Sequence, residues 1–215
     1  MKKQSLEELA KLISDILEKR YPNSKCSLIF KNNFELIIAA RLSAQCTDKC
    51  VNRITPKLFS VFPNAILMAS AKIEEIENLI KPCGIYKTKA REIKEISKIL
   101  KNEYDSKIPF GIENLIKLPG IGRKTANLVM SEVFGEPAVI VDTHVLRVTR
   151  RLGFHNTNNA DKTENILISI LPKNIRTKFC HRILEHGRNV CISRKPKCEM
   201  CCLNDYCLAY KIAIF

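Results

Sequence analysis

Residues Leu118–Ala126 read L-P-G-I-G-R-K-T-A and combine a glycine-rich turn with a lysine at the start of a helix. Gly120 and Gly122 can adopt a positive φ, so the turn can direct its backbone N–H groups toward a phosphate. The helix that begins at Arg123 adds unpaired N–H groups and the positive end of its dipole, and both favour an anion. The segment therefore predicts a phosphate-binding turn, and DNA carries a regular row of phosphates.

Lys124 lies in the first turn of this helix, where the helix dipole opposes a positive charge on its side chain. The helix N-terminus, partial burial and neighbouring Arg123 would all favour the neutral form of the amine, so the position is unfavourable for a lysine that serves only as a permanent charge. The pattern alone also allows an ordinary connection between two helices. In that interpretation Pro119 and the glycines form the turn, and Lys124 is a solvated cation.

Four cysteines near the C-terminus have a spacing typical of metal ligands. They occur as C-x6-C-x2-C-x5-C in a segment too short and polar to form a core of its own: Cys191, Cys198, Cys201 and Cys207. Zinc sites with four cysteines usually contain two C-x-x-C pairs, and this segment contains one. Four thiolates also suit an iron–sulfur cluster. At this point an iron–sulfur cluster, a zinc ion and unligated thiols all remain open.

Six further cysteines lie outside this spacing, and core packing is their expected role: Cys26, Cys46, Cys50, Cys83, Cys180 and Cys202. Cys202 adjoins Cys201 and could compete with it as a ligand. A disulfide framework is not expected, because the acidic residues that follow Met1-Lys2-Lys3 interrupt any signal peptide. We therefore expect a cytoplasmic protein.

The chain of 215 residues is strongly basic, with 36 lysines and arginines against 22 acidic residues and a formal net charge of +14. Solubility alone needs a net charge of only about 2 to 8 in magnitude, so the excess favours a polyanionic partner. No segment is typical of a membrane span or of a basic amphipathic anchor. The composition therefore predicts binding to nucleic acid and no association with a membrane.

These residues must be positioned by helices, because apolar residues recur at helical spacing along nearly the whole chain. Ser5 and Glu8 predict a capping box at the start of the first helix. Further helices are expected over 33–44, 48–61, 71–81, 87–103, 112–117, 123–133, 143–152, 161–170 and 176–190. Pro56 should bend or break its helix. The only extended run, Ala138–Val141, should bury the chain just before Asp142.

Taken together, these motifs resemble the endonuclease III family of DNA glycosylases over nearly the whole chain. The resemblance is carried, in chain order, by Leu42-Ser43-Ala44-Gln45, Gly84-Ile85-Tyr86, Lys89-Ala90, L-P-G-I-G-R-K-T-A-N, V-D-T-H, and H-G-R followed by the four cysteines. It implies an all-α, two-domain helix–hairpin–helix DNA glycosylase fold. A six-helix domain would span 26–136 with the hairpin at about 112–133, and residues 1–25 and 137–215 would form a discontinuous iron–sulfur domain.

In this family the four cysteines of the loop 191–207 bind a [4Fe–4S] cluster, so the resemblance favours that cofactor over zinc. It also implies that Lys124 is the nucleophile, which attacks the sugar of a damaged nucleotide, expels the base and forms a Schiff base. Asp142 would assist deprotonation of the lysine and stabilise the positive sugar. By pattern alone Asp142 is an ordinary helix N-cap, and the two roles can coexist. Lys124 and Asp142 would approach each other across the domain boundary.

The resemblance assigns DNA contacts to three further residues. Ile85 would be a wedge that fills the gap left by a flipped nucleotide, and Gln45 would read the opposite strand. His144 would contact the DNA backbone or the flipped nucleotide. Without the resemblance, Ile85 would be a core aliphatic residue, Gln45 a polar residue after a helix, and His144 a satisfied polar residue.

The loop between Cys191 and Cys198 contains three cations, and a cluster at its ends would present them as a phosphate clamp: Arg194, Lys195 and Lys197. A merely solvated basic loop is the alternative. His181 and His186 are expected to be structural, on a helix packed near the cluster.

The sequence thus predicts a monomeric, bifunctional DNA glycosylase and abasic-site lyase of base excision repair. Its substrate would be double-stranded DNA with an oxidised or saturated pyrimidine or an abasic site. A monofunctional mismatch glycosylase is the closest rival, but such relatives lack a lysine at the position of Lys124, and the adenine-removing ones usually carry a further C-terminal domain. A non-catalytic DNA-binding module would leave Lys124 and Asp142 unexplained. An iron–sulfur redox protein would leave the hairpin unexplained.

Overall fold

In a computed structural model, residues 5–212 are described, and within them the chain forms twelve α-helices and no β-strand. The all-α fold class expected from the sequence is confirmed. The chain divides into two compact units, one continuous over Cys26–Gly135 and one that joins the residues up to Lys25 with those from Glu136 onward. No helix among the described residues is long and apolar enough to span a membrane.

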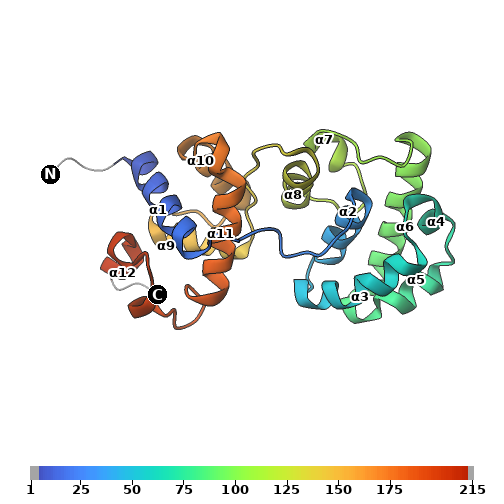
Figure 1. Ribbon diagram of the computed structural model, residues 1–215, viewed down its shortest axis with the longest axis horizontal. Coiled ribbons are helices and arrows are strands. Elements are labelled where there is room, and N and C mark those ends of the chain that lie inside the picture. The colour runs from blue at the N-terminus through green and yellow to red at the C-terminus, as the bar shows by residue number, and fades with distance from the viewer. Residues whose placement is uncertain (1–4, 213–215) are drawn as a thin grey trace. The chain divides into compact units, whose positions relative to one another are not determined.

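The continuous unit is built around one helix that is apolar on all sides. It comprises α2 (Asn33–Leu42), α3 (Asp48–Val61), α4 (Ala65–Ser70), α5 (Ile73–Ile80), α6 (Tyr86–Glu103), α7 (Ile112–Leu115) and α8 (Arg123–Phe134). Nearly every side chain of α2 is buried, and α3, α6 and α8 pack against it (Figure 1). A helix with this pattern is stable only inside a core, so α2 organises the unit.

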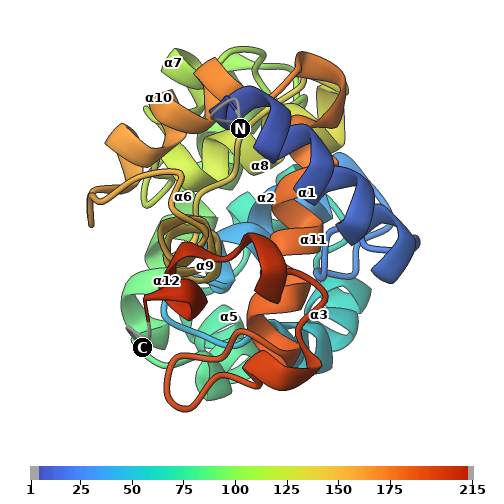
Figure 2. The same cartoon turned by 90° about the vertical axis from the view of Figure 1, so that its left-hand side faces the viewer.

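The discontinuous unit draws its helices from both ends of the chain. It comprises α1 (Leu6–Arg20), α9 (Thr143–Leu152), α10 (Ala160–Ile170), α11 (Arg176–Asn189) and α12 (Leu208–Lys211). The expected capping box of α1 is confirmed, since Ser5 Oγ accepts from Glu8 N at 3.1 Å and Glu8 Oε2 accepts from Ser5 N at 3.0 Å. The buried face of α1 packs against α11 and α10, and Figure 2 shows α1 beside α11.

The helices over 48–61 and 143–152 have the expected bounds, and of the two outcomes expected at Pro56, a bend or a break, the break does not occur. Helix α3 continues through Pro56 with Val51, Ile54 and Leu58 buried on one face. A proline inside a helix costs about 3 kcal/mol, and the burial of this face on both sides of Pro56 offsets that cost.

The expected helix over 71–81 is present as α5, and a 3-10 helix over Lys81–Cys83 follows it. Helix α4, which precedes it, was not expected; it begins after Asn64, whose side chain accepts from Leu67 N at 3.0 Å. The capping asparagine was the sequence signal for α4, and the shortness of this helix concealed it.

The run Ala138–Val141 forms no regular strand, but it is buried as expected. Val139, Ile140 and Val141 are each at most 6% exposed. The run is fastened to α11, because Ile140 N donates to Cys180 Sγ at 3.3 Å and Thr177 exchanges hydrogen bonds with Ala138. This attachment fixes the backbone that leads into α9.

Candidate catalytic residues and the cysteine site

The glycine turn joins α7 to α8, and the expected positive φ is found at Gly120, with φ +69°, but not at Gly122. A Cβ at position 120 would lie 2.8 Å from Glu92 Oε1 and would overlap Arg41, so only glycine fits there. Gly122 has extended backbone at φ −92° and faces open space. Gly120 is thus required by packing, whereas Gly122 leaves the backbone at the helix start accessible.

Arg41 of α2 and Glu92 of α6 form an ion pair that packs against this turn. The Arg41 side chain is only 9% exposed, although it carries a full charge. The sequence analysis did not single out either residue. The available signal was Arg41 itself, because a charge in an otherwise apolar helix needs a buried partner.

Lys124 is the second residue of α8, and its side chain is exposed, as is that of Arg123. The expected partial burial of Lys124 is therefore wrong. The helix start is nevertheless as predicted: Gly122 is the N-cap, and Gly122 O accepts from Ala126 N at 2.9 Å. A side chain at this position is accessible to a ligand bound at the turn.

Gln45 and Ile85 share an unusual backbone. Both are non-glycine residues in the left-handed region, with φ +52° and +48°, and both are exposed. Ile85 is 60% exposed, so the alternative of a core aliphatic residue is wrong. A β-branched residue pays about 1–3 kcal/mol for this conformation, and such strain concentrates at functional sites.

A buried lysine connects the segments that carry these two residues. Lys89 of α6 is 1% exposed, and its Nζ donates to Leu42 O at 3.0 Å and to Cys83 O at 2.6 Å. Burial lowers the pKa of Lys89. One ammonium group therefore fixes the end of α2 to the residues just before Ile85. Lys89 was part of the family resemblance, but no role was assigned to it. Its two hydrogen bonds give it the structural role of joining these segments.

Asp142 is the N-cap of α9, as its pattern predicted. Its Oδ1 accepts from His144 N at 2.9 Å and from Val145 N at 2.7 Å. Both of these bonds use Oδ1, so the cap fixes the carboxylate by one oxygen. Asp142 belongs to the discontinuous unit and Lys124 to the continuous one, and their approach to each other stays a prediction.

His144 is half-buried, and its Nδ1 lies 3.1 Å from Arg147 Nη2. Arg147 also donates to Gly187 O at 2.9 Å and to Cys191 O at 3.1 Å. Burial lowers the pKa of His144, and the charges of Arg147 and Arg188 lower it further. This network holds the start of α9 to the end of α11 and to the segment that begins the cysteine loop.

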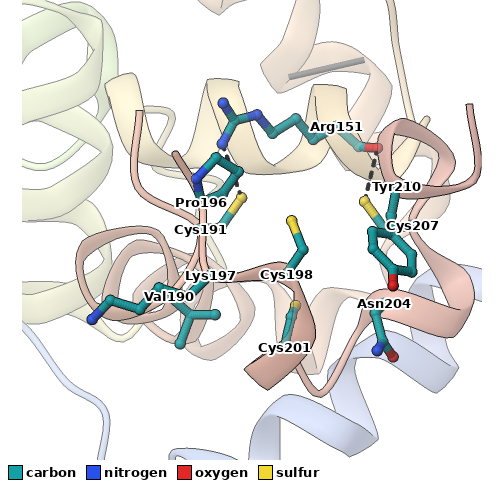
Figure 3. A pocket seen from close by; sticks show the side chains of 10 residues that line it. All are labelled: Arg151, Val190, Cys191, Pro196, Lys197, Cys198, Cys201, Asn204, Cys207 and Tyr210. Carbon is teal, nitrogen blue, oxygen red and sulfur yellow. Dashed lines mark hydrogen bonds between the residues drawn. The ribbon is translucent and has the colours of Figure 1, made fainter. Parts of the chain in front are cut away.

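The four C-terminal cysteines surround one hollow of about 300 Å³, counting the part that is open to solvent. Figure 3 shows their sulfur atoms facing it from successive parts of the loop. Two 3-10 helices, over Cys198–Met200 and Asn204–Tyr206, shape the loop. Among the described residues, no three of these four thiols bring their sulfur atoms within 4.8 Å of one another.

Hydrogen bonds position the sulfur atoms around the hollow. Arg151 Nη1 donates to Cys191 Sγ at 3.4 Å, Leu203 N donates to Cys201 Sγ at 3.4 Å, and Cys207 Sγ donates to Arg151 O at 3.3 Å. Burial raises the pKa of the Cys201 thiol to about 12, so a metal must displace its proton. Donors aimed at sulfur and an adjacent guanidinium both suit thiolate ligands.

Cys202 does not line this hollow, although it adjoins Cys201. His186 is buried as expected, and its Nε2 lies 3.4 Å from Cys201 Sγ. Its Nδ1 lies 3.1 Å from the hydroxyl of Tyr21, a residue that sequence reasoning missed. The expected structural role of His181 agrees with its burial at 9% exposure.

The three cations between Cys191 and Cys198 are exposed, and they line a shallow hollow on the loop. Arg151 holds the loop by donating to Ile192 O at 2.7 Å and to Ser193 O at 2.9 Å. Lys195 adopts a left-handed φ of +52°, which turns the loop sharply. The loop can thus present Arg194, Lys195 and Lys197 to an anion.

Two family models match the chain. One, described as HhH-GPD superfamily base excision DNA repair protein, matches residues 38–173. The other, the iron–sulfur binding domain of endonuclease III, matches residues 191–207. The second match covers the hollow with its four thiols. Together they identify the cofactor as a [4Fe–4S] cluster, and the cofactor prediction is confirmed.

The chain is also similar to individual proteins over nearly its full length. Endonuclease III of Rickettsia felis is 38% identical over 207 residues, which cover 96% of this chain and 97% of the relative. A solved non-covalent endonuclease III–DNA complex has a TM-score of 0.92 and 38% identity, with 99% of each chain covered. A trapped covalent endonuclease III–DNA intermediate, described as an estranged-adenine complex, has a TM-score of 0.92 and 37% identity over 99% of this chain and 100% of that one.

Proposed function

The chain belongs to the endonuclease III family, and we propose that it excises oxidised or saturated pyrimidines from duplex DNA and then cleaves the strand as an abasic-site lyase. The resemblance seen in the sequence is thereby confirmed, and the chain is an enzyme of base excision repair. The net charge of +14 supports binding of a polyanion. We further propose that the protein acts as a monomer in the cytoplasm.

The observation that carries this proposal is an exposed lysine at an open helix start. Lys124 follows the backbone N–H groups of the hairpin turn, which would hold a phosphate together with Arg123. The neutral amine attacks the anomeric carbon, and the bond to the base breaks with its electrons leaving on the base, which takes up a proton. The new linkage nitrogen loses a proton, and its lone pair then forms the C=N bond of the Schiff base. The bond between the anomeric carbon and the ring oxygen breaks at the same time, and the oxygen keeps its electrons and takes up a proton.

Strand cleavage follows from the Schiff base. A proton leaves the adjacent sugar carbon, its electrons form a carbon–carbon double bond, and the 3′ phosphate departs. Asp142 would accept the proton from Lys124 and would stabilise the positive sugar by charge. Its cap supports this role, because the cap uses Oδ1 and fixes the carboxylate in one orientation.

The remaining DNA contacts belong to residues of both units, which are exposed except for the half-buried His144. Ile85 would enter the gap left by the flipped nucleotide, and Gln45 would read the opposite strand. Their exposure and left-handed backbones support these roles. His144 would contact the backbone or the flipped nucleotide. Arg194, Lys195 and Lys197 would clamp phosphates, and exposure on one loop supports this.

The [4Fe–4S] cluster supplies structural cohesion to the C-terminal segment, and we propose that Cys191, Cys198, Cys201 and Cys207 are its ligands. Their arrangement around one hollow supports this set. Leu203 N and the guanidinium of Arg151 would stabilise the thiolates, and the same guanidinium keeps the basic loop in place by donating to its carbonyl groups. The cluster site thus orients the phosphate clamp.

Reductive trapping tests the lyase mechanism directly. With borohydride and duplex DNA that contains an oxidised pyrimidine, the wild type should form a covalent complex and Lys124→Ala should form none. Lys117→Ala is the matched control, because Lys117 is an exposed lysine just before the same turn, and it should be trapped like the wild type. If the wild type binds this DNA but is never trapped, the mechanism through Lys124 is wrong.

A further inference from the structure

A second group of thiols lies in the continuous unit, away from the C-terminal cysteines. Cys46 follows α2, Cys50 lies in the first turn of α3, and Cys83 ends the 3-10 helix before Ile85. Their sulfur atoms all lie within 4.8 Å of one another. Among the described residues no other three of the His, Cys, Asp and Glu side chains come together in this way. We call these residues the hinge thiols.

The spacing of the hinge thiols matches a single metal ion. Zinc–thiolate bonds are about 2.3 Å long, so two thiolates on one tetrahedral zinc lie about 3.8 Å apart. Sulfur atoms already within 4.8 Å reach that spacing by shifts of about an ångström or less. Cys83 is fully buried, whereas Cys46 and Cys50 are partly exposed, which leaves a path for the ion and room for water as a further ligand.

The charges around the hinge thiols also favour a bound ion with thiolate ligands. Lys89 is buried and donates to two carbonyl groups, and no carboxylate of the described chain pairs with it. Three thiolates around a closed-shell ion carry net negative charge, which the ammonium of Lys89 would offset.

We propose that Cys46, Cys50 and Cys83 bind one thiophilic closed-shell metal ion, Zn²⁺ or Cu⁺, distinct from the iron–sulfur cluster. Thiolates select these two ions over harder ones. Each thiol releases its proton to water as the metal–sulfur bond forms, and no electrons are transferred. The ion links the segment of Gln45, which precedes Cys46, to the segment of Ile85, which follows Cys83. The ion therefore fixes the positions of Gln45 and Ile85, the two left-handed residues that we propose contact DNA.

Metal content of the purified iron–sulfur protein tests the site without any DNA. The protein is incubated with Zn²⁺, or anaerobically with Cu⁺, then desalted, and iron, zinc and copper are measured together. The wild type should retain about one added ion per chain with its iron unchanged. Cys46→Ser and Cys50→Ser change partly exposed thiols, and each should lower retention at least tenfold while iron stays constant. The ion that is retained, zinc or copper, identifies the metal.

Cys26→Ser is the matched control, because Cys26 is a half-buried thiol of the same unit outside the group, and it should retain the ion like the wild type. A second measurement is alkylation by iodoacetamide, from which the metal should protect Cys46 and Cys50 but not Cys26. If the wild type retains neither ion, or if Cys46→Ser and Cys50→Ser retain as much as the wild type, the site does not exist. Because no step involves a lesion or Lys124, this result is independent of the trapping experiment.

Discussion

The two units of this chain hold their functional residues in opposite ways. The continuous unit has a large apolar core around α2, and that core holds Gln45, Ile85 and Gly120 in left-handed backbone on its surface. The cysteine loop of the discontinuous unit buries little apolar surface, and polar bonds and thiols surround its hollow. The left-handed residues of the continuous unit thus lie on a packed core, whereas the cysteine loop, which holds left-handed Lys195, is ordered by polar bonds and can be ordered further by a cofactor.

The thiol groups of the two units also differ, in how far apart their sulfur atoms lie. The hinge thiols lie within 4.8 Å of one another and suit a single ion, whereas the C-terminal thiols are spread around a hollow that suits a polynuclear cluster. Both groups offer the same potential ligand atom, a cysteine sulfur. The distance between the sulfur atoms, and not the type of ligand, therefore distinguishes a site for a single ion from a site for a polynuclear cluster.

Loss of the cluster should produce the largest difference between the units. Cys201→Ser should lose iron and expose the loop 191–207 to hydrogen exchange, while Cys26–Gly135 keeps the protection given by its apolar core. Iron content and hydrogen exchange by mass spectrometry measure the two effects. Cys202→Ser is the control, since Cys202 does not line the hollow, and it should keep the cluster. Equal loss of iron in both variants would overturn the ligand assignment.

Mild acid should weaken only the discontinuous unit, because all four histidines lie there. Burial lowers the pKa of His186 from 6.5 to about 4. Between these values the unfolded chain binds a proton that the folded chain does not, so stability falls as pH falls from about 6.5 to about 4, by about 3 kcal/mol in total. Hydrogen exchange at pH 7 and pH 5.5, with iron content checked at both, measures this loss.

His186→Gln removes the titrating group and should flatten that dependence. If the peptides of Cys26–Gly135 lose protection over the same pH range as those of α11, the contrast between the units fails.

Gly120→Ala should destabilise the continuous unit by about 2 kcal/mol, because the new Cβ meets Arg41 and Glu92 and the left-handed φ is strained. Gly122→Ala is matched in chemistry but faces open space with an ordinary φ, so its effect on stability should stay within about 0.5 kcal/mol. Denaturant unfolding measures both. Equal destabilisation by the two variants would show that the turn does not depend on the packing beneath it.

Substitutions of Asp142 should have the smallest effect on stability and a large effect on glycosylase activity. Asp142→Ala removes the cap of α9 and should cost about 1 kcal/mol. Asp142→Asn keeps an oxygen for the same two N–H groups, so it should be nearly as stable as the wild type. Both should lose glycosylase activity, since neither carries a charge. If Asp142→Asn retains full activity, the carboxylate acts only as a cap.

Local signals in the sequence predicted much of this structure. Periodicity and caps located α1, α3 and α9, and the pattern around Asp142 predicted its cap. The break that the sequence allowed at Pro56 does not occur, because tertiary packing outweighs the local preference. The exposure of Lys124 was mispredicted, since burial depends on what surrounds a helix end and not on the helix itself.

The rest of the candidate site depends on contacts between distant residues. Arg41, Glu92 and Gly120 come from three separate helices or turns, and no spacing rule joins them. The same holds for Cys46 and Cys83, which were expected only to pack in the core. The C-terminal cysteines were recognisable because all four fall within one short segment of the sequence. The hinge thiols come from separate segments and become a group only when the chain folds.

The discontinuity of one unit also sets an order for its biosynthesis. Helix α1 is synthesised before the continuous unit, yet its partners α10 and α11 are synthesised after that unit. The intervening unit, Cys26–Gly135, is continuous and can fold while the chain is still growing, because domains generally fold as units during synthesis. The apolar face of α1, with Ala10, Ile13 and Leu17, therefore remains exposed until α10 and α11 have been synthesised. Iron delivery to the loop 191–207 must come later still, because its cysteines follow α11 in the chain.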